Sequence, residues 1–164
     1  MATAAPLTTS NGILRFLYDF NHVAITRNCE GLVHNETLVR PVPKGNCANW
    51  VLGHIVFNRS FILTLVKEQP LWGEGEGAMY ARESKPLEPG DATPFARLLA
   101  DLEETQVRLR RGLEALPEAE LDLKHEEGAT RPRGAQLHFL HFHEAYHAGQ
   151  LGLLRRMAGK DGAI

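Results

Sequence analysis

The segment HFHEAYHAGQLGLLRR, near the carboxyl end of the chain, contains residues that could bind a metal ion. His143, Glu144 and His147 form the pattern H-E-x-x-H, in which zinc peptidases place two histidine ligands and a glutamate base on one helix. On a helix the two histidines lie one turn apart and about 40° apart in projection, so their imidazoles can converge on one ion. The pattern therefore predicts a pair of metal ligands on one helix face.

A third histidine has the same inward orientation on another predicted helix. His54 lies within about 60° of the apolar residues Trp50, Val51, Phe61 and Leu65 on the helical wheel. Three buried imidazoles without partners would cost desolvation energy, whereas one shared metal ion satisfies all three. We therefore predict a metal site formed by His54, His143 and His147.

Three protein ligands would leave open positions for water or substrate, unlike a closed structural zinc site. Cys47, the candidate for a fourth ligand, lies about 10 Å along the helix from His54, which is too far. Cys29 and His22 are expected to face outward together, and so are His138 and His141. His34 and His125 fall in predicted loops or helix ends.

Glu144 decides between a peptidase and another kind of site. A peptidase would need a third ligand after His147, but no histidine or cysteine follows it, and no strand is predicted to hold a peptide. Glu144 lies at the edge of the inward face, where it could transfer a proton or support a ligand. An ordinary helix glutamate or an interhelical salt bridge is the favoured alternative, so we assign no catalytic residue.

Four amphipathic helical stretches are predicted to position these residues. They span about 9–32, 47–68, 93–117 and 132–158, with Asn46 and Thr93 as expected N-caps of the second and third. The connection from Pro70 to Ala92 is long enough to cross the length of a bundle, so the helices on either side of it can run parallel. We predict an all-α four-helix bundle at residues 9–159, a disordered N-terminus at 1–8 and a tail at 160–164.

The apolar spacing within these stretches predicts which side of each helix is buried. In the first stretch the predicted buried residues are Ile13, Phe16, Phe20 and Ala24. The last stretch carries an additional apolar strip that either forms a dimer interface or contacts neighbouring helices: Phe139, Phe142, Tyr146 and Leu153. In the long connection, the apolar residues Trp72, Met79 and Tyr80 either cover the metal or, as we favour, anchor the loop.

Composition argues against several classes of partner. The formal charge of −2 provides no general attraction to nucleic acid or to anionic membranes. No secretory signal and no apolar run of about 20 residues is present, so a cytoplasmic protein with two reduced cysteines is expected.

The segments NWVLGHI (49–55) and HEAYHAGQLGLLRR (143–156) together resemble the DinB/YfiT-like superfamily of metal-dependent bundles. The matching positions are His54, His143 and His147, with Gly149 and Gln150 completing the late motif. The resemblance implies an up-down-down-up bundle, a divalent ion held by the three histidines and water, and a homodimer. It also implies transfer of a small-molecule thiol to a small electrophile.

The sequence is compatible with more than one metal and more than one function. The metal is expected to be zinc or nickel, with iron also suited to imidazole ligands. A non-catalytic metal- or ligand-binding bundle is the main alternative to a thiol transferase, and a zinc peptidase is the weakest.

Overall fold

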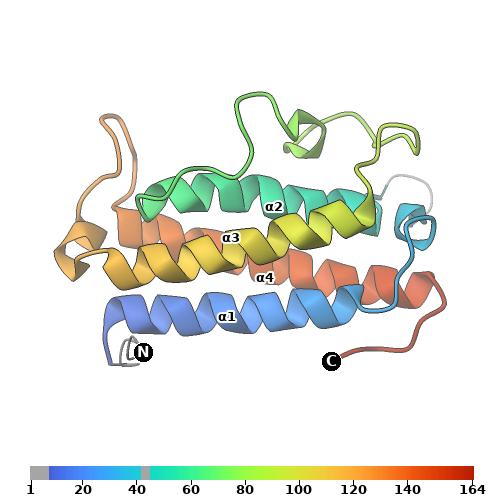
Figure 1. Cartoon of the computed structure of the whole chain (residues 1–164), viewed down its shortest axis with the longest axis horizontal. Helices are drawn as coiled ribbons and strands as arrows, with labels where there is room; N and C mark the ends of the chain where they lie inside the picture. The colour runs from blue at the N-terminus through green and yellow to red at the C-terminus, as the bar shows by residue number, and fades with distance from the viewer. Residues whose placement is uncertain (1–7, 42–44) are drawn as a thin grey trace.

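Four long helices account for most of the computed structural model, which describes residues 8–41 and 45–164 (Figure 1). They are α1 (Ser10–Cys29), α2 (Ala48–Leu65), α3 (Phe95–Ala115) and α4 (Arg133–Met157). Three short 3₁₀ turns lie in the connections: Glu36–Leu38, Ala78–Tyr80 and Glu118–Asp122. No strand occurs in the described ranges, so the predicted all-α class is confirmed. The predicted disordered segment 1–8 lies outside the described residues except for Thr8.

Helices α1 and α4 run parallel and are joined by side-chain to main-chain hydrogen bonds. The Asn21 amide donates to the His141 carbonyl (3.0 Å) and the Asn28 amide donates to the Ala148 carbonyl (3.1 Å). From the first bond to the second, the residue number increases along α1 and also along α4, as parallel helices require. The asparagines thereby supply buried α4 carbonyls with a second hydrogen bond, which apolar side chains could not do.

Helices α2 and α3 also run parallel, as the long connection predicts. The Asn49 amide donates to the Thr93 carbonyl, and farther along α2 the Arg59 guanidinium donates to the Leu102 carbonyl. The connection between the two helices crosses the length of the bundle above α2 in Figure 1. The predicted up-down-down-up order with one crossover is therefore present.

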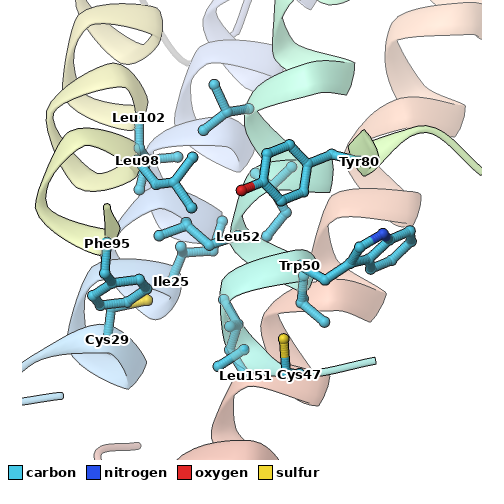
Figure 2. Close-up of a cluster of buried hydrophobic side chains, with 14 of the residues drawn as sticks. Ile25, Cys29, Cys47, Trp50, Leu52, Tyr80, Phe95, Leu98, Leu102 and Leu151 are labelled. Atoms are coloured by element: carbon cyan, nitrogen blue, oxygen red, sulfur yellow. The ribbon is translucent and has the colours of Figure 1, made fainter. Parts of the chain in front are cut away.

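The core lies between the four helices in two clusters of buried side chains. Figure 2 shows the cluster that lies at the carboxyl end of α1, including side chains from all four helices. Its labelled members include Ile25, Leu52, Leu98, Leu102 and Leu151. The inward side of α4 is buried here through Leu151 and Leu154 and in the second cluster through Leu137 and Leu140.

The predicted buried face of α1 is wrong. Ile13, Phe16 and Phe20 are exposed to solvent, and the opposite side of the helix enters the core through these apolar residues: Leu14, Tyr18 and Ile25. Spacing alone misled because α1 has apolar residues on both sides, while its buried side also carries asparagines that bond to neighbouring main chains.

This reversed orientation corrects further predictions for α1. His22 is buried and its Nε2 lies 3.0 Å from the Glu103 carboxylate, and Cys29 is 2% exposed. His141, also expected outside, is half-buried with its ring against Tyr18.

The predicted caps of α2 and α3 are each off by one position. α2 follows Cys47 and α3 follows Pro94, and neither residue makes a side-chain capping bond. None of the helices in the described ranges combines the length and hydropathy that a membrane crossing requires.

Candidate metal centre

Three imidazoles, from His54 on α2 and from His143 and His147 on α4, meet in the groove between these antiparallel helices. The Nε2 atom of His143 lies 3.4 Å from Nε2 of His54 and 3.2 Å from Nε2 of His147. With zinc–nitrogen bonds of roughly 2.0–2.1 Å, tetrahedral ligands are about 3.3 Å apart. These two separations match a single divalent ion of this size, and the ligand atoms of all three histidines lie within 4.8 Å of one another.

Hydrogen bonds on the far side of two rings fix which nitrogen faces the centre. His54 Nδ1 lies 2.6 Å from the Tyr80 carbonyl, which can only accept, so Nδ1 carries the proton. His147 Nδ1 lies 2.7 Å from Gln150 Oε1, while the Gln150 amide nitrogen donates to the Tyr146 hydroxyl. Both Nε2 lone pairs consequently point inward, as metal-ligating histidines require.

The residues from Trp50 to Gly53 help to position the His54 ring. The Trp50 ring stacks on the His54 ring at 4.7 Å, and its indole N–H donates to the Met79 carbonyl. A Cβ at Gly53 would lie 2.4 Å from the Tyr80 ring, so the crossover residue Tyr80 can pack against α2 only because residue 53 is glycine. These contacts fix the crossover to α2 at the point where the Tyr80 carbonyl accepts the hydrogen bond from His54. They support the interpretation that the apolar residues of the crossover anchor it to the bundle.

The imidazoles border a cavity of about 550 Å³, large enough for a small molecule. Its lining is largely polar and combines residues of α2, α4 and the segment before α2 with three residues of the crossover: Asn46, Trp50, Tyr146 and Gln150, and Arg82, Glu83 and Ser84. Glu83 has a positive φ of 65°, an uncommon conformation for this residue type. Among the described residues that line the cavity, the basic Arg82 and the acidic Glu83 both come from the crossover.

Burial keeps the three rings neutral. It lowers the pKa of His54, of His143 and, to about 4, of His147. For His147 the neighbouring imidazoles lower the pKa further, although the Gln150 hydrogen bond opposes them. Neutral imidazoles offer their lone pairs to a metal without first losing a proton.

The metal-free protein should lose stability as pH falls. Unfolded His147 titrates near 6.5 and the folded residue near 4, so the unfolded chain binds more protons between these values. The free energy of unfolding is therefore expected to fall as pH decreases from 6.5 towards 4, as measured by urea denaturation after chelation. The variant His147→Gln should show a shallower pH dependence, and equal slopes in the two proteins would contradict this account.

The Glu144 side chain points into the bundle and does not line the cavity. Its two carboxylate oxygens accept hydrogen bonds from Arg59 at 2.7 and 3.0 Å, and the two side chains are only 4% and 1% exposed. Arg59 also donates to Thr105 and Leu102 on α3. The favoured interhelical salt bridge is present, and the peptidase pattern does not place its glutamate as a base.

Sequence reasoning missed three residues near the site: Arg59, Asn58 and Arg82. Arg59 had a usable signal, since an arginine within a strongly apolar helix needs a buried acidic partner. Asn58 follows His54 by one turn, and its amide nitrogen lies 3.1 Å from His54 Nε2. Arg82 had no signal, because only the folded crossover brings it to the cavity.

The remaining candidates lie elsewhere. Cys47 is buried at the start of α2 and is not part of the three-histidine group. His34 accepts a hydrogen bond from the Phe95 main chain, His125 packs against Phe61, and His138 is exposed.

Comparison with known proteins agrees with this architecture. The sequence model of the DinB superfamily matches residues 22–151. A crystal structure of a conserved protein from Enterococcus faecalis superposes with a TM-score of 0.72 over 93% of this chain and 99% of that chain. The two sequences are 18% identical, so this likeness shows the fold alone. No curated protein matches the chain significantly in sequence.

Proposed function

The chain belongs to the DinB superfamily, and from this premise we propose that it is a metal-dependent thiol transferase. His54, His143 and His147 would hold one divalent ion. When bound, this ion would lower the pKa of a coordinated thiol and so supply the nucleophilic thiolate. The observation that carries the proposal is the convergence of three neutral imidazoles at the wall of a 550 Å³ cavity. Zinc or nickel is the preferred ion and iron is the next choice, because imidazole suits all three.

The crossover side of this cavity would bind the thiol substrate. Arg82 and Glu83 line it, and their side chains are 88% and 83% exposed with only a 3.5 Å contact between them. An exposed pair of this kind contributes little stability, so both groups are free to bind a ligand. A thiol with an amino group and a carboxylate would complement the two charges.

The reaction can be tested with defined substrates. Zinc- or nickel-loaded protein is mixed with cysteine or glutathione and 1-chloro-2,4-dinitrobenzene. The thiol sulfur forms a bond to the ring carbon, chloride leaves with the electron pair of the broken bond, and the thiol proton passes to solvent. Loss of thiol above the uncatalysed rate, abolished by chelation and by His147→Ala, would support the transferase.

Two alternatives predict other results. A non-catalytic metal- or ligand-binding bundle would bind the ion and show no metal-dependent consumption of either substrate. A zinc peptidase would cleave casein and lose this activity in Glu144→Ala, although the Arg59 contact opposes that role for Glu144.

We also propose that a second copy of the chain binds the α1–α4 face. This face consists of apolar side chains on the outward sides of two parallel helices, each between 44% and 68% exposed: Ile13, Phe16, Phe20, Val23, Phe142, Tyr146 and Leu153. The bond between Asn21 and His141 joins the helices beside Phe20 and Phe142, so the two rows lie next to each other.

Its size and chemistry suit a symmetric dimer. With roughly 200 Å² per large apolar side chain, the exposed fractions amount to on the order of 800 Å². A stable interface buries about this area on each partner. Since the seven side chains carry no charge, the same face of a second copy related by a twofold axis would match it.

Phe142→Asp is expected to convert the dimer to monomer, because an unpaired carboxylate would be buried at the centre of the interface. Size-exclusion chromatography with light scattering at about 50 μM would measure the mass. Val107→Asp is the matched control, since Val107 is an exposed apolar residue of α3 outside this face. A monomeric wild type, or a dimer that persists in Phe142→Asp, would contradict the proposal.

A further inference from the structure

A second cavity of about 500 Å³ lies on the outer side of α2, under the start of the crossover. In contrast to the polar cavity beside the imidazoles, its walls are largely apolar. They include Phe57 and Phe61 from α2 together with Pro70 and Trp72 from the crossover. A cavity of this size and character is typical of a site for a small apolar ligand.

Asn58 connects this apolar cavity with the metal centre. Its side chain lines the cavity, while its amide nitrogen lies 3.1 Å from His54 Nε2 and donates to the His54 carbonyl at 2.8 Å. A molecule in the apolar cavity would therefore meet the imidazole group at Asn58. His54 lines the polar cavity, and Asn58, one turn farther along α2, lines the apolar one.

The wall formed by the crossover is held in place by buried contacts. The Trp72 main-chain N–H donates to the Ser60 hydroxyl, and its indole N–H donates to Asp101 at 2.9 Å. Gly77 has a φ of 76°, and a Cβ there would lie 2.2 Å from the Trp72 ring. The cavity is thus shaped before any ligand arrives, which reduces the ordering cost of binding.

The charges around the cavity select the kind of ligand. Glu74 and Glu76 lie at its solvent side, and the lining includes no lysine, arginine or histidine. The exposed Glu74 carboxylate disfavours an anion, whereas the Glu76 carboxylate is paired with Arg97 at 3.5 Å, and the apolar walls disfavour any charged group. The cavity is therefore suited to an uncharged molecule with an aromatic or other apolar body.

We infer that this cavity is the acceptor subsite, which binds a small uncharged electrophile beside the thiol. The inference rests on the proposed function, because a transferase needs a second substrate and a passive metal-binding bundle does not. With the acceptor seated against Phe57 and Phe61, the thiol sulfur bonds to its reactive carbon. The leaving group departs with the electron pair of the broken bond, and the thiol proton passes to solvent.

The binding step can be tested without metal, thiol or turnover. Nitrobenzene, an uncharged probe, is titrated into the chelator-treated full chain while the Trp72 indole N–H is followed by NMR. A saturable shift is expected, and Phe61→Ser should weaken the affinity roughly tenfold through loss of an aromatic contact. Thr64→Phe, at an exposed position that lines the cavity, should block binding by filling it.

Matched controls decide the outcome. Val107→Ser removes an exposed apolar side chain of α3, outside this cavity and outside the α1–α4 face, and should leave nitrobenzene binding unchanged. The anion 4-nitrobenzoate should bind at least about tenfold more weakly than nitrobenzene. A shift that does not saturate would overturn the inference. So would wild-type affinity for nitrobenzene in Phe61→Ser and Thr64→Phe, or binding of 4-nitrobenzoate as tight as that of nitrobenzene.

The same variants separate this inference from the proposed function. On metal-loaded protein, Phe61→Ser should raise KM for 1-chloro-2,4-dinitrobenzene severalfold and leave KM for the thiol unchanged. Arg82→Ala should raise KM for the thiol severalfold and leave KM for 1-chloro-2,4-dinitrobenzene unchanged. Absence of thiol transfer in a protein that binds nitrobenzene would defeat the transferase. Transfer with an unchanged acceptor KM in Phe61→Ser would defeat only the acceptor subsite.

Discussion

His54→Ala is expected to leave a folded bundle that no longer retains a metal ion. His54 supplies the sole α2 ligand of the three-histidine group, and the two remaining imidazoles both come from α4. Loss of a residue that merely orients a ligand weakens metal affinity about 10–100-fold, so loss of the ligand itself should exceed about a hundredfold. Metal content by mass spectrometry of tag-free protein should therefore fall from about one ion per chain to near zero.

The exposed histidine of α4 provides the control for this measurement. His138→Ala removes an imidazole outside the group and should retain the wild-type metal content. Metal retained in His54→Ala would disprove the three-histidine site and leave the α4 pair alone. Should neither protein contain metal, zinc and nickel are added back. Failure of the wild type to bind either ion would favour a bundle without a metal function.

Glu144→Ala is expected to destabilise the protein by about 3–5 kcal/mol, because it leaves the Arg59 guanidinium buried without its carboxylate partner. The remaining contacts of Arg59, to Leu102 and Thr105, are both 3.4 Å and cannot neutralise its charge. Urea denaturation of the metal-free protein at neutral pH measures the change. A peptidase base at Glu144 would instead predict a loss of cleavage with little change in stability.

Two further variants isolate the buried pair. The double variant Arg59→Met with Glu144→Leu removes both charges and should recover most of the lost stability. Glu104→Ala, which breaks an exposed pair with Arg108, should change the free energy of unfolding by less than about 1 kcal/mol. A cost below this value for Glu144→Ala would show that the Arg59 contact does not stabilise the fold.

Much of the site could be predicted because its parts are local. His143 and His147 share a helix face whatever that helix contacts, and the apolar neighbours of His54 already indicate its inward side. The long segment between α2 and α3 likewise indicates that these helices run parallel. Helix geometry and chain length are sufficient for each of these inferences.

The side of α1 that enters the core could not be predicted in the same way. Phe16 and Phe20 form a more apolar row than the buried side, where Asn21 and Asn28 interrupt the pattern. Those asparagines are favourable inside because α4 presents carbonyls to them. A polar residue is recognisable as a core residue only when its partner is known.

The amino-acid sequence by itself determined the helices, their order and the three histidines that can meet. Only the tertiary structure decided that Glu144 pairs with Arg59, that the Tyr80 carbonyl holds His54, and that Arg82 reaches the cavity. The physical reason is that periodicity fixes the direction of a side chain relative to its own helix. The partner it meets depends on how helices and crossover pack, through contacts between residues far apart in the chain.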